Sequence, residues 1–378
     1  MEGLLALEDG TVFSGRSFGA RGERAGEVVF NTSMTGYQEV LTDPSYRGQM
    51  VAMTAPQIGN TGINEEDMES AGPHVQAFLV REVAPLASNW RSRQELGQFL
   101  REHAIVALAD LDTRALTRHV RAHGAMRAVI STEDLSPASL VAKARAAPDI
   151  SEHNYVADVS CKAPYEWEAG HPRGWSQLAP LEVRRHILVY DCGVKRSILA
   201  HFADLGCRVT VVPWNTPAED ALAYEPDGIF LSNGPGDPRQ LPELADIVRA
   251  LLGRRPILGI CLGHQMLGLA YGARIIKLSF GHHGGNQPVL DQKLRRVEIT
   301  AQNHNYAVDG ATLDPEEVEI THINLNDHTI EGMRHRRYPI MSVQYHPEAG
   351  PGPHDATGLF VRFLQMVDEN KGSGNGRN

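Results

Sequence analysis

The chain has 378 residues, enough for two or three domains, and its 42% hydrophobic and 22% charged content is ordinary for a globular protein. Its net charge of −10 opposes a general affinity for nucleic acid or for an anionic membrane, because both need a basic surface. No stretch reaches the roughly 18 apolar residues of a membrane span. The N-terminus lacks the basic and apolar regions of a signal peptide, so we expect a cytoplasmic protein without nucleic-acid or membrane partners.

The first part of the chain has the pattern of a mixed α+β domain, which we place at residues 1–150. Residues 4–13 read as two short strands around an Asp-Gly turn. Further apolar strands are expected at Glu27–Phe30, Gln49–Met53 and Ala104–Leu108, and a helix at Asp112–His123.

A stretch without steady periodicity follows, and we assign residues 151–184 as a linker between domains. The Gly-rich end of the chain, residues 371–378, is expected to be a disordered tail. The second domain lies between these two segments, at residues 185–370.

The second domain alternates short apolar strands with helices, which predicts a mostly parallel sheet flanked by helices, the α/β class. In chain order, we expect strands at 186–191, 207–212, 228–232, 256–260 and 340–344, and helices at 195–205, 217–223, 241–252 and after residue 261. In such sheets the active site lies at the carboxyl ends of the strands. Polar motifs that follow these strands are therefore expected to lie near one another.

The most informative of these motifs is Gly259–Gln265, in which Cys261 stands between two glycines at a strand-to-helix turn. This is the pattern of a nucleophile elbow, and the start of a helix favours the thiolate. A lone free cysteine is more often a buried structural residue. The four cysteines show no paired spacing, so neither a disulfide framework nor a zinc site is expected, and a reducing compartment fits.

A cysteine nucleophile needs a base, and the best candidate is His346, which follows the strand at 340–344. Glu348 is two residues further and can orient the imidazole, as in a catalytic triad. A loop histidine taken alone is usually structural or solvated. Its place at a strand end beside the cysteine motif favours the functional interpretation.

The turn Asn233–Pro238 follows another strand, and its glycines can turn backbone N–H groups toward a developing negative charge. Taken alone, it would be an ordinary Pro-Gly turn. The chain contains neither a P-loop nor a dinucleotide-binding glycine motif, so we do not expect nucleotide binding.

Together these three motifs resemble the class I glutamine amidotransferase domain, whose members hydrolyse the side-chain amide of glutamine and pass ammonia to a second active site. Four further segments resemble the small subunits of glutamine-dependent carbamoyl phosphate synthetases: Asn31–Glu39, Thr42–Tyr46, Phe280–Val289 and Ala301–His304. The resemblance covers both halves of the chain, from near residue 1 to about residue 370. The first-half motifs make it specific, because other amidotransferases of this class lack that domain.

The resemblance implies a role for each matching residue. Cys261 would attack the amide carbon, His346 would act as general base and then acid, and Glu348 would orient His346. The backbone N–H groups of Leu262 and Gly236 would hold the oxyanion. The amino-acid end of glutamine would be held by Ser45, Gly234, Gln265, Asn303, Asn305 and Tyr306.

One position departs from the family pattern. The family often has Gly-Phe after Asn-His, whereas this chain has Asn305–Tyr306. A backbone contact to glutamine would survive this change, but a close approach that requires glycine would not. The pair His282–His283 has no further ligand at metal-binding spacing, and we expect no metal. The pair Lys195–Arg196 is expected to lie in a subunit contact or at a solvated helix start.

By resemblance, the activity is that of the glutaminase subunit of carbamoyl-phosphate synthesis, in a heterodimer or higher oligomer, and the domain at residues 1–150 would contact the partner. Ammonia would pass to a large subunit that uses bicarbonate, ATP and Mg²⁺ for pyrimidine and arginine synthesis, with no cofactor on this chain. Two alternatives stay open: an amidotransferase subunit for another acceptor, and a catalytically silent scaffold subunit.

Overall fold

The computed structural model describes residues 2–171 and 184–374. The chain forms two compact units. Unit 1 consists of residues 1–153, 278–285 and 350–352, and unit 2 of residues 154–277, 286–349 and 353–378.

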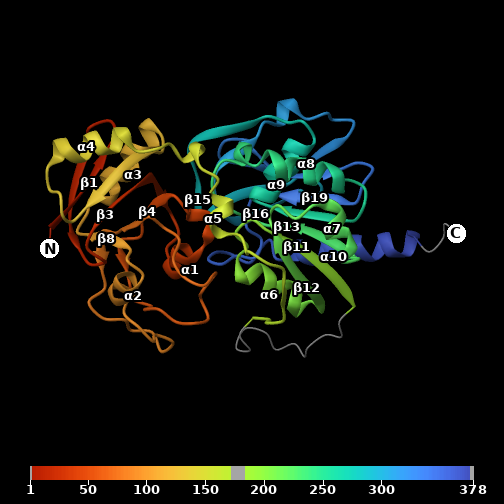
Figure 1. Cartoon of the computed structure of the whole chain (residues 1–378), viewed down its shortest axis with the longest axis horizontal. Helices are drawn as coiled ribbons and strands as arrows, with labels where there is room; N and C mark the ends of the chain where they lie inside the picture. Colours follow the sequence, from red (N-terminus) through yellow and green to blue (C-terminus); the bar gives the residue numbers. More distant parts are fainter. Residues whose placement is uncertain (1, 172–183, 375–378) are drawn as a thin grey trace. The chain divides into compact units, whose positions relative to one another are not determined.

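Seven strands of unit 1 form a closed barrel in the order β1-β2-β8-β6-β4-β3-β9 (Figure 1). Their bounds are β1 Glu2–Leu7, β2 Val12–Ser17, β3 Glu23–Asn31, β4 Gln49–Met53, β6 Ala77–Leu79, β8 Val106–Ala109 and β9 Met126–Ser131. A separate two-stranded sheet pairs β5 (Gln57–Ile58) with β7 (Glu82–Val83).

Buried segments of several barrel strands are apolar on both faces, and their residues alternate between two hydrophobic clusters. In β3, Val28 and Phe30 belong to one cluster and Val29 to the other. In β4, Met50 and Val51 divide in the same way. This follows from the two-residue period of a strand. The near-continuous apolar runs in the sequence therefore mark strands buried on both sides.

The helices of unit 1 pack against these strands. They are α1 Tyr37–Thr42, α2 Leu96–Glu102, α3 Thr113–His123 and α4 Pro137–Ala146. Leu116 and Val120 of α3 pack into one cluster of the barrel, and Leu140 of α4 packs beside β1 and β9. The predicted strands and the helix at Asp112–His123 are confirmed, with end shifts of a few residues.

Unit 2 contains one sheet of ten described strands, in the order β10-β12-β11-β13-β14-β19-β18-β17-β15-β16. The bounds are β10 Tyr165–Trp167, β11 Arg185–Asp191, β12 Cys207–Pro213, β13 Gly228–Leu231, β14 Ile257–Ile260, β15 Ile275–Asp291, β16 Arg296–Val308, β17 Val318–Asn324, β18 Ile330–His335 and β19 Ile340–Val343. The five strands from β12 to β19 are parallel, whereas β10, β18 and β17 pair antiparallel.

Helices cover both faces of this sheet. They are α6 Arg196–Asp204, α7 Ala218–Ala223, α8 Pro242–Leu251, α9 Leu262–Ala270 and α10 Gly358–Gly374. In β11, Leu188 and Tyr190 face the cluster that contains α7, α8 and α9, whereas Ile187 and Val189 face the cluster of α6 and α10. The predicted α/β class is confirmed. The sheet is mixed, however, because long antiparallel strands extend its parallel centre.

The predicted domain limits need correction at three places. The assigned linker 151–184 contributes α5 (Tyr155–Val159) and β10 to unit 2, because β10 supplies an edge pair to β12; its residues 172–183 lie outside the described residues. Residues 278–285 and 350–352 belong to unit 1, although their sequence position suggested the second domain. In the predicted disordered tail, α10 continues through Gly374, and residues 375–378 lie outside the described residues.

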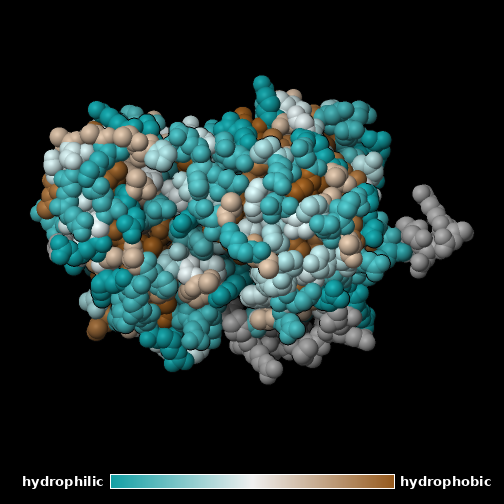
Figure 2. Space-filling model, viewed as in Figure 1, coloured by the Kyte–Doolittle hydropathy of each residue, from teal (hydrophilic) through white to brown (hydrophobic). Residues whose placement is uncertain are grey.

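Side chains on the visible face of each unit are mostly hydrophilic (Figure 2). Among residues 2–171 and 184–374, no helix combines the length and the apolar character needed to cross a membrane.

Candidate active site

Cys261 occupies a sharp turn between β14 and α9. Its φ of 53° and ψ of −103° place a non-glycine residue in a region that costs about 1–3 kcal/mol and recurs at functional sites. The flanking glycines permit the turn sterically. A Cβ atom on Gly263 would lie 2.1 Å from the carbonyl oxygen of Leu231, and one on Gly259 would lie 2.7 Å from the Gly263 carbonyl. The Gly-x-Cys-x-Gly pattern is therefore a packing requirement of the elbow.

The sulfur of Cys261 is buried at the start of α9, and the residue is only 2% exposed. Its Sγ donates a 3.5 Å hydrogen bond to the carbonyl oxygen of Asn303. The backbone N–H of Cys261 donates to Val343 of β19 at 2.9 Å, which fixes the turn to the neighbouring strand. N–H groups in the first turn of a helix have no partner within it, so the Leu262 N–H is available beside the sulfur.

His346 and Glu348 form a buried pair beyond the end of β19. Nδ1 of His346 lies 2.6 Å from Oε1 of Glu348, and the residues are 4% and 3% exposed. The His346 N–H donates to Ala301 of β16 at 2.8 Å, which anchors the loop. Among the described residues, Nε2 of His346 is buried without a hydrogen bond. The second ring nitrogen is therefore free to exchange a proton.

The electrostatics of this pair favour the charged forms. Burial lowers the pKa of His346, but the Glu348 charge and interactions with Cys261 outweigh burial and raise this pKa well above its ordinary value. Burial raises the pKa of Glu348, but the charges of Lys195 and His346 outweigh it and hold this pKa well below its usual range. Glu348 is thus a carboxylate that stabilises an imidazolium.

Lys195 is the site residue that sequence reasoning misplaced. Its Nζ lies 2.8 Å from Oε1 of Glu348, and the residue is 2% exposed. Both expectations for it, a subunit contact and a solvated helix start, are wrong, because the side chain turns inward from the N-terminus of α6. The available signal was its position, four residues beyond the carboxyl end of β11, at the same edge of the sheet as Cys261 and His346.

Most residues predicted to contact glutamine belong to unit 2, together with Cys261. Gln265 donates from Nε2 to the carbonyl oxygen of Tyr306 at 2.7 Å, which joins α9 to β16. A Cβ atom on Gly234 would lie 2.8 Å from Leu262 Cδ2, so the Gly-rich turn packs against the start of α9. Gly236 has a φ of +85°. This set of unit 2 residues is Gly234, Gly236, Leu262, Gln265, Asn303, Asn305 and Tyr306.

Ser45 belongs to unit 1 instead. It lies in the 3-10 helix Pro44–Tyr46 and donates its N–H to Oδ1 of Asp43 at 2.9 Å, which fixes the turn locally. Its role toward glutamine stays a prediction.

The departure at Asn305–Tyr306 is accommodated as regular strand. Both residues lie in β16 and are 5% and 2% exposed. Asn305 is not among the described residues with positive φ, so its backbone conformation does not require glycine.

The other three cysteines are free thiols away from His346 and Glu348 in sequence. Burial raises the pKa of Cys161 and of Cys207 to about 12, and burial raises the pKa of Cys192 even further. They are free thiols held neutral by their apolar surroundings. Cys192 also follows a strand and precedes a helix, but none of the three has the positive φ of Cys261 immediately before a helix, so Cys261 is the thiol suited to nucleophilic chemistry.

Comparisons with known proteins show the family of the chain. The family model "Glutamine amidotransferase class-I" matches residues 188–366, and "Carbamoyl-phosphate synthase small chain, CPSase domain" matches residues 5–130. The chain is 54% identical over 376 residues to the carbamoyl phosphate synthase small chain of Syntrophotalea carbinolica, covering 99% of this chain and 100% of the relative. It is 54% identical to the small chain of Thermosynechococcus vestitus, covering 96% of each, and 51% identical to that of Aquifex aeolicus, covering 96% of this chain and 98% of the relative.

Both halves of the chain match, including the first-half domain that distinguishes these proteins from other amidotransferases. The chain therefore belongs to the carbamoyl-phosphate synthase small chain family.

Proposed function

We propose that this chain is the glutamine-hydrolysing subunit of a carbamoyl-phosphate synthase and that Cys261 is its nucleophile. The observation that carries this proposal is the strained strand-to-helix elbow that holds Cys261, buried, at the start of α9. Glu348 and Lys195 complete the buried charge system behind the imidazole of His346. The family relationship supports the same conclusion.

The reaction follows from these groups. The thiolate of Cys261 attacks the side-chain amide carbon of glutamine, and the N–H groups of Leu262 and Gly236 stabilise the resulting oxyanion. His346 gives a proton to the leaving nitrogen, so ammonia departs and a γ-glutamyl thioester forms. His346 then takes a proton from water as the water attacks the thioester. Collapse of this second intermediate releases glutamate and restores Cys261 with its proton shared with His346.

The buried carboxylate explains how one imidazole serves both steps. Glu348 favours the imidazolium, which stabilises the thiolate before attack and stores the proton that ammonia takes away. Lys195 keeps Glu348 ionised in a site with little water. The side chains of Gln265 and Asn303 and the backbone around Gly234 are proposed to hold the amino-acid end of glutamine, together with Ser45, Asn305 and Tyr306.

Ammonia made here is proposed to be consumed by a large chain in a heterodimer or higher oligomer. That partner would bind ATP and Mg²⁺ and combine ammonia with bicarbonate to form carbamoyl phosphate for pyrimidine and arginine synthesis in the cytoplasm. We expect no cofactor on this chain.

The test compares Cys261→Ala with Cys161→Ala, which removes a thiol away from the elbow. Each variant is assembled with the cognate large chain, and glutamate release and carbamoyl phosphate formation are measured with glutamine or with ammonium chloride. Cys261→Ala should lose both glutamine-dependent activities and keep ammonia-dependent synthesis, whereas Cys161→Ala should keep all three. Glutamine-dependent synthesis by Cys261→Ala would show that Cys261 is not the nucleophile. Failure of the wild-type complex to release glutamate would support the silent scaffold.

A further inference from the structure

The two backbone N–H groups that serve the oxyanion in the proposed reaction belong to different elements of unit 2. Leu262 is the first residue of α9, and Gly236 lies in the turn that follows β13. Within the part of the chain that the structure describes, neither N–H has a hydrogen-bond partner. Such donors act only when both lie roughly 2.7–3.1 Å from the position of the oxyanion. The placement of Gly236 relative to α9 therefore matters to the reaction.

The turn that carries Gly236 needs an anchor at each end. It has a glycine on either side of Pro235, and Gly236 adopts a φ of +85°. Because glycine reaches many other conformations at little cost, this segment does not fix its own shape. Ser232 anchors the upstream end, where its hydroxyl accepts the Cys192 N–H at 2.9 Å. The downstream end requires a second anchor.

Arg239 supplies the downstream anchor through Asp237. Asp237 is 2% exposed, and its carboxylate begins the 3-10 helix Pro238–Gln240 by accepting the Arg239 N–H at 2.9 Å. The guanidinium returns to the same carboxylate, with Nε 2.9 Å from Oδ1 and Nη2 2.5 Å from Oδ2. In the described chain, every hydrogen bond to this carboxylate comes from Arg239. Such a forked contact fixes the direction of the arginine side chain.

The same guanidinium also reaches β16. Its Cζ lies 5.6 Å from the centroid of the Tyr306 ring, within the range of a cation–π contact. Nζ of Lys277 lies 6.0 Å from that centroid, so the ring is near two cations. Tyr306 is 2% exposed, and its carbonyl oxygen accepts Nε2 of Gln265 in α9 at 2.7 Å. Contacts therefore run from the glycine turn through Arg239 and Tyr306 to the helix that begins at Leu262.

We propose that Arg239 and Tyr306 form a bracket that holds the Gly236 N–H beside the Leu262 N–H. This rests on the proposed function, which assigns these two groups to the oxyanion. Arg239 is a positioning residue, because it acts through Asp237 and the turn. Its loss should slow both steps that pass through an oxyanion, the formation and the hydrolysis of the thioester. Binding of glutamine in the ground state should change little, since no oxyanion exists there.

The experiment compares Arg239→Met with a matched control, Arg274→Met. Arg274 also belongs to unit 2, and its Nη2 lies 2.9 Å from Oδ2 of Asp309, which caps another 3-10 helix. Each full-length variant is assembled with the cognate large chain, and kcat and KM for glutamate release are measured. Arg239→Met should lower kcat by about tenfold or more and keep KM within about threefold. The control should keep both constants within about twofold of the wild type.

Variants of Tyr306 test whether the two residues act together. Tyr306→Leu removes the aromatic face and should lower kcat, whereas Tyr306→Phe keeps that face and should lose much less. The double variant Arg239→Met/Tyr306→Leu should be no slower than the slower single variant, because each change breaks the same contact. Losses that multiply would show that the residues act separately, and they would overturn the bracket.

A further variant separates positioning from folding. Arg239→Met leaves the buried carboxylate of Asp237 without its partner, whereas Asp237→Asn/Arg239→Met removes that charge and keeps an oxygen for the helix cap. This double variant should unfold at a denaturant concentration close to that of the wild type and still show the low kcat. Recovery of kcat in it, an unchanged kcat in Arg239→Met, or a raised KM alone would overturn the bracket. A wild-type complex that releases no glutamate would overturn the proposed function as well.

Discussion

Two lysine–carboxylate ion pairs in this molecule have the same nitrogen–oxygen distance, but one is buried and the other is exposed to water. Lys195 and Glu348 in unit 2 lie 2.8 Å apart, with side chains that are 2% and 0% exposed. Lys143 and Glu23 in unit 1 also lie 2.8 Å apart, but their side chains are 42% and 32% exposed. Water screens the second pair and leaves the first at full strength. Distance alone therefore does not show which ion pair matters.

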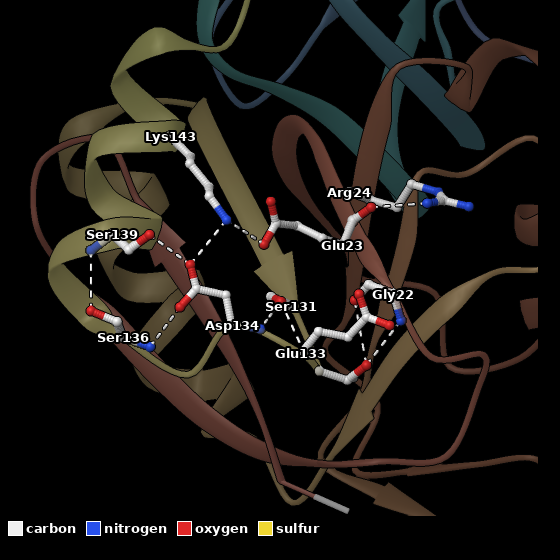
Figure 3. A network of polar contacts seen from close by, with 10 residues as sticks. Gly22, Glu23, Arg24, Ser131, Glu133, Asp134, Ser136, Ser139 and Lys143 are labelled. Carbon is white, nitrogen blue, oxygen red and sulfur yellow. Dashed lines mark hydrogen bonds and ion pairs between the residues drawn. The ribbon is translucent and has the colours of Figure 1, made fainter.

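The difference in burial decides what each network does. Around Glu348, two cations outweigh the cost of burial and hold its pKa below the usual range, and its charge in turn raises the pKa of His346. In the network of Figure 3, a hydrogen bond from Ser139 is the largest of several contacts that lower the pKa of Asp134 to about 2. No reactive group lies in that network as drawn. The buried network tunes chemistry, whereas the exposed one only links α4 to β3 at the surface.

The largest effect is expected from breaking the buried pair. Lys195→Met should destabilise the protein by about 3–5 kcal/mol, because it leaves Glu348 buried without its main compensating charge. Glutamate release should fall as well, since Glu348 would lose its ionised form and with it the imidazolium of His346. Denaturant unfolding and a glutaminase assay measure the two losses. The double variant Lys195→Met/Glu348→Gln should recover stability but not activity; a double variant no more stable than the single one would refute the unpaired-charge explanation.

A smaller effect is expected at the elbow of Cys261. Gly263→Ala places a Cβ 2.1 Å from a backbone oxygen of β13, so α9 must shift away from the sheet. Overpacking of this kind costs about 1–3 kcal/mol, and the shift should lower glutamate release by moving Cys261 relative to His346. Gly358→Ala is the matched control, because nothing lies within 4 Å of its Cβ position. Equal activity in the two variants would show that the elbow tolerates the displacement.

Acidification should destabilise the two units to different extents. Burial lowers the pKa of His201 and His322 in unit 2 to about 4 and that of His264 to about 3, whereas in unit 1 burial lowers the pKa of His74 to about 4. The unfolded chain binds protons below about pH 6.5 and these folded histidines do not, so stability falls as pH drops from 6.5 toward 4. Each group should remove about 1–2 kcal/mol by pH 5.

Unit 2 should therefore lose more stability than unit 1 between pH 7 and pH 5. Hydrogen exchange of amides in β11 and in β4, corrected for the intrinsic rate, reports the two units separately. Glu348 does not contribute in this window, because its depressed pKa means that its contribution is lost only below about pH 4.5. The raised pKa of His346 acts in the opposite direction, because its stabilising contribution still grows as pH falls from 7 to about 6.5, but one such group offsets only part of the loss from three neutral histidines. Equal loss of protection in both strands would show that the buried neutral histidines do not cause the loss of stability in acid.

The smallest effect is expected on the surface. Lys143→Met removes two ion pairs, yet the denaturant midpoint should scarcely move, because exposed pairs contribute little. Glutamate release should be unchanged. A loss of stability as large as that of Lys195→Met would mean that burial does not separate the two networks.

Local sequence patterns were sufficient to predict much of the fold and the positions of the reactive groups. The alternation of apolar strands with helices predicted the parallel centre of unit 2, and the Gly-x-Cys-x-Gly spacing predicted the elbow at Cys261. These features depend on near neighbours in the chain, on side-chain period and on the space that glycine leaves. His346 and Glu348 could be found because both follow a strand at the same edge of the sheet.

Tertiary structure decided what depends on distant residues. Lys195 and Glu348 are 153 positions apart, and no local pattern distinguishes a buried lysine from a solvated one. The antiparallel extension of the sheet, and the inclusion of residues 278–285 and 350–352 in unit 1, likewise follow from packing between segments far apart in sequence. The sequence by itself determined which residues can react and where the chain turns. Only the folded chain decided which charges lose their water, and that loss makes the buried pair strong and leaves its surface counterpart weak.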